Sequence, residues 1–291
     1  MKQINLPNPC NIRQALTASG QLFSKLGFAT PQLDARVLLS FVTNLAMEDI
    51  VKKYEDNLSD EQLKSFTEVV NERANGKPVS KILGYKYFWK YKFFTSEDVL
   101  DPRNDSETLI EHVLATFQDK TKELKIIDLG VGSGCLIISL LLEYKNSKGT
   151  GIDISDKAIE IAKKNLNEYK LNSRLNILKS NWLENINEKF DIIISNPPYI
   201  ITKDIENLSV EVKKFDPYLA LNGGEDGLDC YRTIAKELKK IVSETSIIFF
   251  EIGQDQLDDL INIMSSQGFE CLSYLEDLNG IIRSCAFQIK H

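Results

Sequence analysis

Four consecutive residues, Asn196-Pro197-Pro198-Tyr199, combine side chains that could act on a planar amino group. They follow residues 191–195, an apolar and β-branched run that predicts a buried strand, and ligands of open α/β sheets bind where such strands end. A conjugated NH2 group is a poor nucleophile because its lone pair is delocalised. The Asn196 side-chain oxygen and the Pro197 carbonyl could accept its two protons, and Tyr199 could stack on the flat group. The motif therefore indicates methylation of such a nitrogen, although Asn-Pro also forms ordinary turns.

A glycine-rich turn, Gly130-Val131-Gly132-Ser133-Gly134, is a candidate cofactor site between a predicted strand and a predicted helix. Glycines let a ligand approach the backbone closely and permit positive φ. The spacing is Gly-x-Gly-x-Gly rather than the Gly-x-Gly-x-x-Gly of dinucleotide-binding enzymes. The turn therefore fits a ligand with an amino-acid tail better than it fits a pyrophosphate.

The next two strands end in residues that suit a nucleoside. Asp153 ends one of them, where an acidic side chain can bind both ribose hydroxyls. Asn181 and Trp182 follow the other, and we expect Trp182 to pack against an adenine ring while Asn181 hydrogen-bonds to its edge. Each feature alone is also common as a cap or a turn. Their order on successive strands, with the Asn-Pro-Pro-Tyr motif after the fourth, indicates S-adenosylmethionine and a seven-stranded methyltransferase sheet.

Composition sets outer bounds on the function. The chain has 291 residues and a formal net charge of -7, which argues against broad nucleic-acid binding because that needs a basic surface. Its five cysteines include no Cys-x-x-Cys pair, so we expect neither a zinc site nor disulfides, and a reducing cytoplasmic location. We expect no bound metal. We also expect no membrane contact, because the chain has neither a long apolar stretch nor a signal-peptide start.

The periodicity changes along the chain and predicts three parts: a helical domain at 1–84, a linking β-hairpin at 85–103 and a catalytic domain at 104–291. In the first part, Ser59 starts a capping box, and Leu33, Val37 and Phe41 share one helix face. In the last part, strands and helices alternate, which indicates a parallel sheet. The predicted strands are 124–128, 149–153, 175–179, 190–195 and 246–252; the helices are 134–144, 156–169, 227–243 and 255–267; an antiparallel pair is expected at 269–275 and 282–289.

With these elements in place, the chain resembles the PrmC/HemK family, the release factor glutamine methyltransferases. The resemblance extends from about Lys77 to Gln288. Residues 77–84 are similar to the family's Pro-x-x-Tyr-x-x-Gly element, with Lys81 where tyrosine is usual. Residues 102–107 are similar to Pro-Arg-x-Asp-Thr-Glu, with Ser106 replacing threonine. Residues 216–229 are similar to a long loop that starts with Glu-Pro in the family and with Asp216 here.

The resemblance implies a class I S-adenosylmethionine-dependent methyltransferase fold (α/β, Rossmann-like) with a small N-terminal helical domain that recognises the substrate. It implies methylation of the glutamine of the Gly-Gly-Gln motif of class I peptide-chain release factors, giving N5-methylglutamine and S-adenosylhomocysteine. Separately from the resemblance, we expect the protein to be a monomer. Carried over by position, the catalytic residues are Asn196, Pro197 and Tyr199, and Pro198 joins them in binding the glutamine. The implied cofactor-binding residues are Gly130, Val131, Gly132, Ser133, Gly134, Asp153, Trp182 and Asn196.

Departures from the family pattern concern the cofactor more than the chemistry. Val131 and Ser133 stand where threonines are common, and Asn181 replaces the usual aspartate. Cofactor affinity is therefore expected to differ from that of the family. Arg103 and Glu107 are expected either to shape a lid over the cofactor or to form a structural ion pair at the hinge.

Three other functions stay open on the sequence alone. The nearest is an amino-methyltransferase acting on adenine N6 or guanine N2 of nucleic acid, since both are conjugated NH2 groups like the glutamine amide. The acidic charge and the 216–229 loop favour a protein substrate. A non-catalytic cofactor-binding module is disfavoured by the intact Asn-Pro-Pro-Tyr motif, and an NAD-dependent oxidoreductase by the glycine spacing.

Overall fold

Residues 3–290 are described by the computed structural model, and the chain divides into two units, one ending at Gly84 and the other starting at Tyr85. The first unit is helical. Its core lies between three longer helices, and short helical segments complete it. The helices are α1 (Ile12–Lys25), α2 (Pro31–Thr43), α3 (Met47–Ile50), η1 (Val51–Lys53), α4 (Asp60–Ala74) and α5 (Val79–Leu83).

Capping side chains explain where two of these helices begin. Ser59 and Gln62 exchange side-chain and backbone hydrogen bonds at the start of α4, which confirms the predicted capping box, and Asn11 does the same with Gln14 at α1. The face of α2 that was predicted to be apolar does not form the core, however. Leu33 is 52% exposed and Phe41 is 43% exposed, so Leu38 and Leu39 supply the buried contacts instead.

The second unit opens with the predicted hairpin, formed by β1 (Tyr85–Phe88) and β2 (Tyr91–Phe94) in antiparallel register. Asn165 holds it against the rest of the unit. Its Oδ1 accepts from Phe94 N at 2.7 Å, and its Nδ2 donates to the carbonyls of Phe94 and Ser133 at 3.0 and 2.8 Å. The strands stop at Phe94, well before the end of the segment 85–103 that was predicted as the linking hairpin.

A seven-stranded mixed sheet forms the centre of this unit, in the order β5-β4-β3-β6-β7-β9-β8, and confirms the expected fold class. The first five strands in that order are parallel, and β9 and β8 close the sheet antiparallel. The strands are β3 (Lys125–Leu129), β4 (Lys148–Asp153), β5 (Leu175–Lys179), β6 (Phe190–Ser195), β7 (Val242–Glu251), β8 (Phe269–Glu276) and β9 (Ile282–Ile289).

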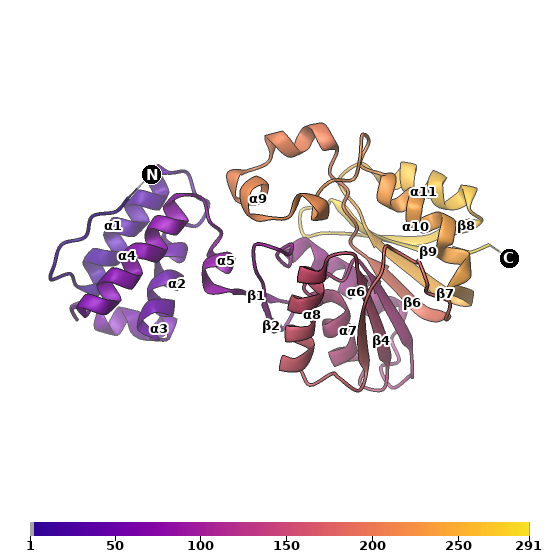
Figure 1. Ribbon diagram of the computed structural model, residues 1–291, viewed down its shortest axis with the longest axis horizontal. Coiled ribbons are helices and arrows are strands. Elements are labelled where there is room, and N and C mark those ends of the chain that lie inside the picture. The colour runs from indigo at the N-terminus through magenta and orange to yellow at the C-terminus, as the bar shows by residue number, and fades with distance from the viewer. Residues whose placement is uncertain (1–2, 291) are drawn as a thin grey trace. The chain divides into compact units, whose positions relative to one another are not determined.

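Alternating side chains of the strands build one core on each face of the sheet. Ile126, Ile192 and Ile194 pack against α6 (Glu107–Thr116), α7 (Cys135–Glu143) and α8 (Asp156–Glu168). Their neighbours Ile127 and Ile193 pack on the other face against α10 (Asp229–Glu237) and α11 (Leu257–Ser266). Figure 1 shows α10 and α11 on the opposite side of the sheet from α7 and α8.

One predicted helix was too long. The helical pattern at 227–243 ends with α10 at Glu237 and a turn of η5 (Leu238–Lys240), and β7 starts at Val242 rather than at 246. The backbone of Ile241 accepts a hydrogen bond from Phe190, and Val242 pairs with Phe190. Pairing with β6 therefore overrides local helix preference at this point.

Register brings the ends of four parallel strands to one edge. Leu129 pairs with both Ile152 and Ser195, and Ser195 pairs with Phe250. The residues that follow these positions therefore meet at the carboxyl edge of the sheet. An insertion after β6 covers this edge and contains η3 (Thr202–Asn207), α9 (Val210–Phe215) and η4 (Tyr218–Ala220).

Candidate active site

A cavity of about 260 Å³ lies at this edge, close to the lower end of the range for small-molecule sites, roughly 300–1,000 Å³. All its lining residues belong to the second unit. Most of the predicted site residues line it: Gly130, Val131, Gly132, Ser133, Asp153, Trp182, Asn196 and Pro198. Gly134, Pro197 and Tyr199 are not among its lining residues.

The glycine turn forms one wall of the cavity. Gly130 has a φ of 79°, and a Cβ added to it would lie 3.7 Å from Cζ3 of Trp182, so the indole packs against this part of the turn. Trp182 itself has a φ of 47°, which is rare for a bulky residue. Gly134 serves a different purpose, since it is the N-cap of α7.

Asp153 connects this wall to the next turn. Its Oδ2 accepts a hydrogen bond from Gly132 N and its Oδ1 accepts one from Ser155 N, each at 2.9 Å. Burial raises the pKa of Asp153, while these two bonds act in the opposite direction. Each carboxylate oxygen has a further lone pair, so the side chain can still accept hydrogen bonds from a ligand. Beside it, Asn181 lines the cavity and donates to Glu184 Oε1 at 2.8 Å.

Asn196 follows β6, and its side-chain amide is oriented by a residue distant in sequence. Its Nδ2 donates to Ser106 Oγ at 3.1 Å. Ser106 is 3% exposed and ends η2 (Asn104–Ser106), directly before α6. No residue in 3–290 donates a hydrogen bond to Asn196 Oδ1. Since Asn196 lines the cavity, its oxygen is the polar end available to a ligand there.

Pro197 and Tyr199 flank Pro198, which lines the cavity, but are not themselves among its lining residues. Pro197 is buried, and Tyr199 is half-buried with its hydroxyl 3.5 Å from Glu251 Oε1. Burial raises the pKa of Tyr199 above its ordinary value, so the phenol stays neutral. Stacking of Tyr199 on a substrate stays a prediction.

The Gln256 side chain fixes the backbone around Tyr199. Its Nε2 donates to the carbonyls of Tyr199 and Gly227 at 3.1 and 3.3 Å, and its Oε1 accepts from Gly253 N at 2.9 Å. Space here is closely filled: a Cβ on Gly227 would lie 2.5 Å from the Tyr199 carbonyl oxygen, and the φ of Gly227 is 80°. A side chain at 227 would therefore force the Asn-Pro-Pro-Tyr segment to move.

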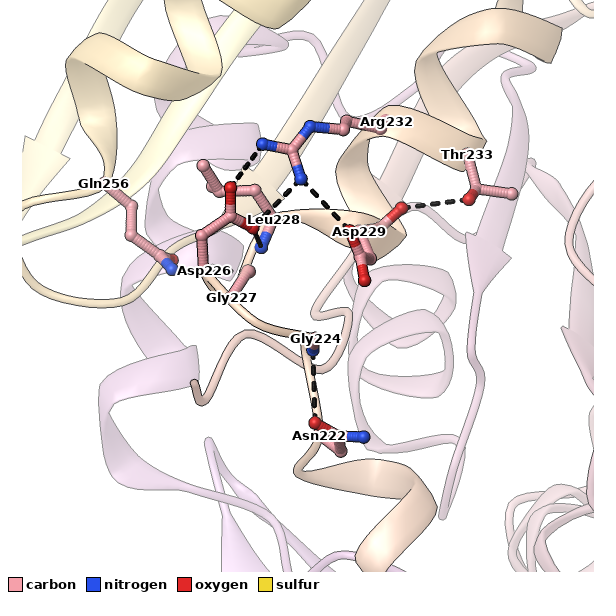
Figure 2. A network of polar contacts seen from close by, with 9 residues as sticks. All are labelled: Asn222, Gly224, Asp226, Gly227, Leu228, Asp229, Arg232, Thr233 and Gln256. Carbon is pink, nitrogen blue, oxygen red and sulfur yellow. Dashed lines mark hydrogen bonds and ion pairs between the residues drawn. The ribbon is translucent and has the colours of Figure 1, made fainter. Parts of the chain in front are cut away.

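Figure 2 shows the polar contacts that order the loop between η4 and α10. Arg232 forms a two-pronged ion pair with Asp226, at 2.9 and 2.5 Å, and the Asp226 Oδ1 also accepts from Leu228 N. Asn222 Oδ1 accepts from Gly224 N at 3.1 Å. These contacts within the loop and with Arg232 of α10 therefore fix the conformation of the loop.

This loop also pairs with the chain that leaves the Asn-Pro-Pro-Tyr motif. Ile200 N donates to Leu221 O at 3.0 Å, Gly223 N donates to Ile200 O at 2.8 Å, and Thr202 N donates to Gly224 O at 2.9 Å. The result is a short parallel bridge centred on Ile200 and Asn222. This bridge fixes the chain directly after Tyr199, and the Asn196–Ser106 hydrogen bond fixes the other end of the motif.

Arg103 and Glu107, which the sequence suggested for a lid or a hinge, have different contacts. Arg103 Nη2 lies 2.5 Å from Asp216 Oδ2, and the Asp216 side chain is only 4% exposed. Arg103 and Pro217 both line the cavity, so this ion pair joins two of its walls. Glu107 instead accepts a hydrogen bond from Trp89 N at 2.6 Å and so binds the turn of the hairpin.

Glu251 is a residue that the sequence analysis missed. It ends β7, is 1% exposed, and its Oε2 has no hydrogen-bond partner in the part of the chain that the structure describes. Burial raises the pKa of Glu251 to about 7. An acidic residue at the end of an apolar strand was the available signal, the same one that identified Asp153. A second buried carboxyl lies on β3, where burial raises the pKa of Asp128 well above its ordinary value.

Two cysteines line the cavity but are poor nucleophiles. Burial raises the pKa of Cys135 to about 12 and that of Cys230 to about 11. Within residues 3–290, no group of three or more His, Cys, Asp or Glu side chains could hold a metal ion. Over the same span, no helix combines the length and the apolar character needed to cross a membrane.

Two family models match this sequence. The model described as "PrmC N-terminal domain" matches residues 14–84, and the model described as "Methyltransferase small domain" matches residues 94–214. The matched segments fall in the first and the second unit respectively.

Similar curated proteins span both segments. A release factor glutamine methyltransferase of Agrobacterium fabrum is 37% identical over 276 residues, which cover 94% of this chain and 96% of the relative. A release factor glutamine methyltransferase of Caulobacter vibrioides is 34% identical and covers 91% and 92% respectively. A bifunctional methyltransferase of Rickettsia felis is also 34% identical, but this chain spans only 58% of it.

Among solved structures, the hMettl16 catalytic domain in complex with a MAT2A 3′UTR hairpin superposes with a TM-score of 0.55 at 16% identity. The match covers 68% of this chain and 76% of that one. At this identity the likeness shows the methyltransferase fold alone.

Proposed function

Because this chain belongs to the release factor glutamine methyltransferase family, we propose that it methylates the side-chain amide nitrogen, N5, of the glutamine in the Gly-Gly-Gln motif of class I peptide-chain release factors. The methyl donor in this proposal is S-adenosylmethionine. The family assignment confirms the resemblance that the sequence motifs indicated, and the near-complete coverage of the Agrobacterium fabrum relative supports carrying over its activity.

The cavity fits such a donor. Methyltransferases of this fold use S-adenosylmethionine in general, and it supplies an electrophilic sulfonium methyl group when bound. We assign the ribose hydroxyls to Asp153, whose carboxylate retains lone pairs at the cavity wall. The adenine would lie beside Trp182, and the turn from Gly130 to Ser133 would leave room for the amino-acid tail.

One observation supports the assignment of the acceptor side: Asn196 lines the cavity and its nitrogen donates to Ser106, so its oxygen is the atom left to accept from a ligand. A glutamine amide placed there would donate one N–H to Asn196 Oδ1 and the other to the Pro197 carbonyl. These two acceptors would rotate the nitrogen lone pair out of conjugation and stabilise the positive charge that develops on it. Positioning of this kind can lower a barrier by roughly 7–11 kcal/mol, so no residue has to remove a proton before attack.

The same proposal includes the partner and its setting. Class I release factors are the substrate, the chain acts as a monomer in the cytoplasm, and the first unit contributes to recognition of the partner. The match of residues 14–84 to the PrmC N-terminal domain supports a dedicated role for that unit.

The deciding experiment is peptide mass spectrometry of a release factor incubated with this protein and S-adenosylmethionine. We expect one methyl group on the glutamine of Gly-Gly-Gln. A release factor carrying alanine at that glutamine is the matched control and should stay unmodified. An unmodified glutamine, with cofactor binding shown by calorimetry, would refute the substrate assignment and direct the search to amino groups of nucleic acid.

A further inference from the structure

Side chains of α8 pair with one edge of the hairpin in the way that a third strand would. Along its other edge, β2 pairs with β1. On the edge beside α8, the Tyr169 hydroxyl accepts from Lys92 N at 2.9 Å and donates to Lys92 O at 2.7 Å (Figure 1). One turn earlier on the helix, the Asn165 amide accepts from Phe94 N and donates to Phe94 O. Both backbone groups of each strand residue are therefore satisfied by a single side chain.

The spacing of the two side chains on α8 matches the spacing of their partners on β2. Asn165 and Tyr169 are four residues apart, so they share one helix face and lie about 6 Å apart along the axis. Lys92 and Phe94 are two residues apart on a strand, which is about 6.6 Å. The helix therefore fixes the hairpin at two neighbouring points.

The two side chains differ in one contact. Asn165 is completely buried, and its Nδ2 also donates to the Ser133 carbonyl at 2.8 Å. Within residues 3–290, the Tyr169 hydroxyl bonds to Lys92 alone. Ser133 belongs to the glycine turn and lines the cavity. Of the two side chains, Asn165 alone therefore joins the hairpin to the candidate cofactor site.

The same face of α8 supports the glycine turn a second time. A Cβ added to Gly134 would lie 3.6 Å from Ala162 Cβ and 3.7 Å from Ala162 Cα. Ala162 lies one turn before Asn165, and Ala158, one turn earlier still, lines the cavity. The end of the glycine turn is thus held against the helix by packing at Gly134 and by the hydrogen bond at Ser133.

A second wall of the cavity starts from the same amide. Residues 98–103, which follow β2, line the cavity together with the glycine turn. The two walls approach each other closely, since a Cβ added to Gly132 would lie 3.7 Å from Val99 Cγ2. Phe94 leads into one wall and Ser133 belongs to the other. Because one side-chain amide bonds to both residues, it constrains the distance between the walls.

We propose that Asn165 is a positioning residue for the cofactor, which holds the glycine turn and the segment after β2 at the spacing that the cofactor requires. This inference rests on the proposed function, because it takes S-adenosylmethionine as the ligand of the cavity. Asn165 is not among the lining residues, so it acts through the two walls. Walls that are fixed in advance lose less conformational freedom when the ligand binds, which increases affinity.

The direct test is calorimetry of S-adenosylhomocysteine binding to full-length variants. Asn165→Ala should raise the Kd roughly 5- to 50-fold. The nearly isosteric Asn165→Asp loses both N–H donors and should raise the Kd likewise at about pH 8. The proposal is overturned by a Kd within about twofold of the wild type in Asn165→Ala, or in Asn165→Asp should the alanine variant fail to fold.

Tyr169→Phe is the matched control. It removes the two hydrogen bonds to Lys92 but leaves the contact with Ser133 in place. This variant and Asn165→Ala should both unfold at a lower urea concentration than the wild type, since each loses two bonds to β2. In Tyr169→Phe, however, the Kd should stay within about twofold of the wild type. An equal rise of the Kd in both variants would attribute the effect to general anchoring of the hairpin and overturn the specific role of Asn165.

Hydrogen exchange of the wild type gives a second readout that needs no variant. Coupling between two sites is reciprocal, so a ligand that steadies the glycine turn should also steady the groups held by Asn165. Saturation with S-adenosylhomocysteine should slow exchange of the Phe94 amide more than exchange of the Lys92 amide. Equal slowing of the two amides would contradict the proposal.

These outcomes separate the inference from the function on which it rests. If the wild type methylates the glutamine and the Asn165 variants bind S-adenosylhomocysteine as the wild type does, the positioning role is wrong and the function stands. If the wild type binds S-adenosylhomocysteine but leaves the glutamine unmodified, the substrate assignment is wrong, and the Kd values still decide the role of Asn165. If the wild type does not bind it, the proposed function and the inference are both wrong.

Discussion

At the scale of single residues, Asn196 Oδ1 and the Pro197 carbonyl are the acceptors between which charge would develop on the attacked nitrogen. We expect Asn196→Ala to lower kcat by roughly 10²–10³, the usual effect of losing one preorganised polar group. The fold should persist, because the side chain makes one hydrogen bond and is partly exposed. Methyl transfer and thermal unfolding would be measured together, with the exposed Asn172→Ala as control. Near-normal turnover would rule out the role.

Asp153 is expected to act on cofactor affinity instead. Asp153→Ala removes a charged acceptor, so calorimetry should show a Kd for S-adenosylmethionine raised roughly 10- to 150-fold, or about 1.5–3 kcal/mol. At saturating cofactor the loss of kcat should be small. The control is Asp156→Ala, an exposed aspartate whose ion pair is with Lys179. An unchanged Kd would count against the ribose assignment.

Residue patterns reveal acceptors more readily than the groups that orient them. The Asn-Pro-Pro-Tyr motif and Asp153 were predicted at strand ends, and both lie at the ends of β6 and β4. Ser106 and Gln256 were not predicted as site residues, because they are 90 and 60 positions from Asn196 and no local pattern links them to it. Only the register of β6 with β7 and the placement of η2 bring such residues together.

At the scale of elements, Gln256 connects the turn after β7, the Asn-Pro-Pro-Tyr segment and the loop before α10. We expect Gln256→Ala to leave the Tyr199 and Gly227 carbonyls without their donor and to lower the free energy of unfolding by about 1–3 kcal/mol. The KM for the release factor should rise as the segment loosens, while the Kd for cofactor changes little.

Gln267→Ala is the matched control for that variant. Gln267 lies at the other end of α11, and the hydrogen bond that its side chain donates goes to the adjacent Ser266. Peptide KM and chemical denaturation would be compared for the two variants. Equal KM values would show that the loop is held without Gln256.

The elements themselves were largely predictable. Strands 175–179 and 190–195 have the predicted bounds, and the closing antiparallel pair is confirmed. The error at 227–243 arose because Ile241 and Val242 satisfy a helical pattern and a strand equally well. Their partner, Phe190, lies about 50 residues earlier, so periodicity alone could not choose between the two.

At the scale of the whole molecule, buried carboxyl groups make stability depend on pH. Burial raises the pKa of Glu251 from 4.5 to about 7, so between these values the folded state holds a proton that the unfolded state has released. Its contribution is therefore fully present below about pH 4.5 and is lost as pH rises through 7. The change is on the order of 3 kcal/mol.

Glu251→Gln should remove this dependence and be relatively more stable than the wild type at pH 8 than at pH 5. Trp89 and Trp182, the two tryptophans of the chain, both lie in the second unit, so their fluorescence during urea unfolding reports on that unit. Burial lowers the pKa of His112, so the contribution of His112 to stability increases as the pH rises. Since the wild type and Glu251→Gln both contain His112, it does not alter the difference between them. A constant difference in stability across this range would mean that Glu251 is ionised throughout.

The bridge between Ile200 and Asn222 has a consequence for how the site opens. Its three backbone hydrogen bonds join segments that are both tied down elsewhere, so none of them can break without disturbing the others. The opening free energies obtained from deuterium exchange at the amides of Ile200, Thr202 and Gly223 should therefore be equal, as in a single cooperative unit. The rate at which a polypeptide substrate enters the site would then depend on one cooperative opening of this bridge rather than on independent motion of a flexible loop.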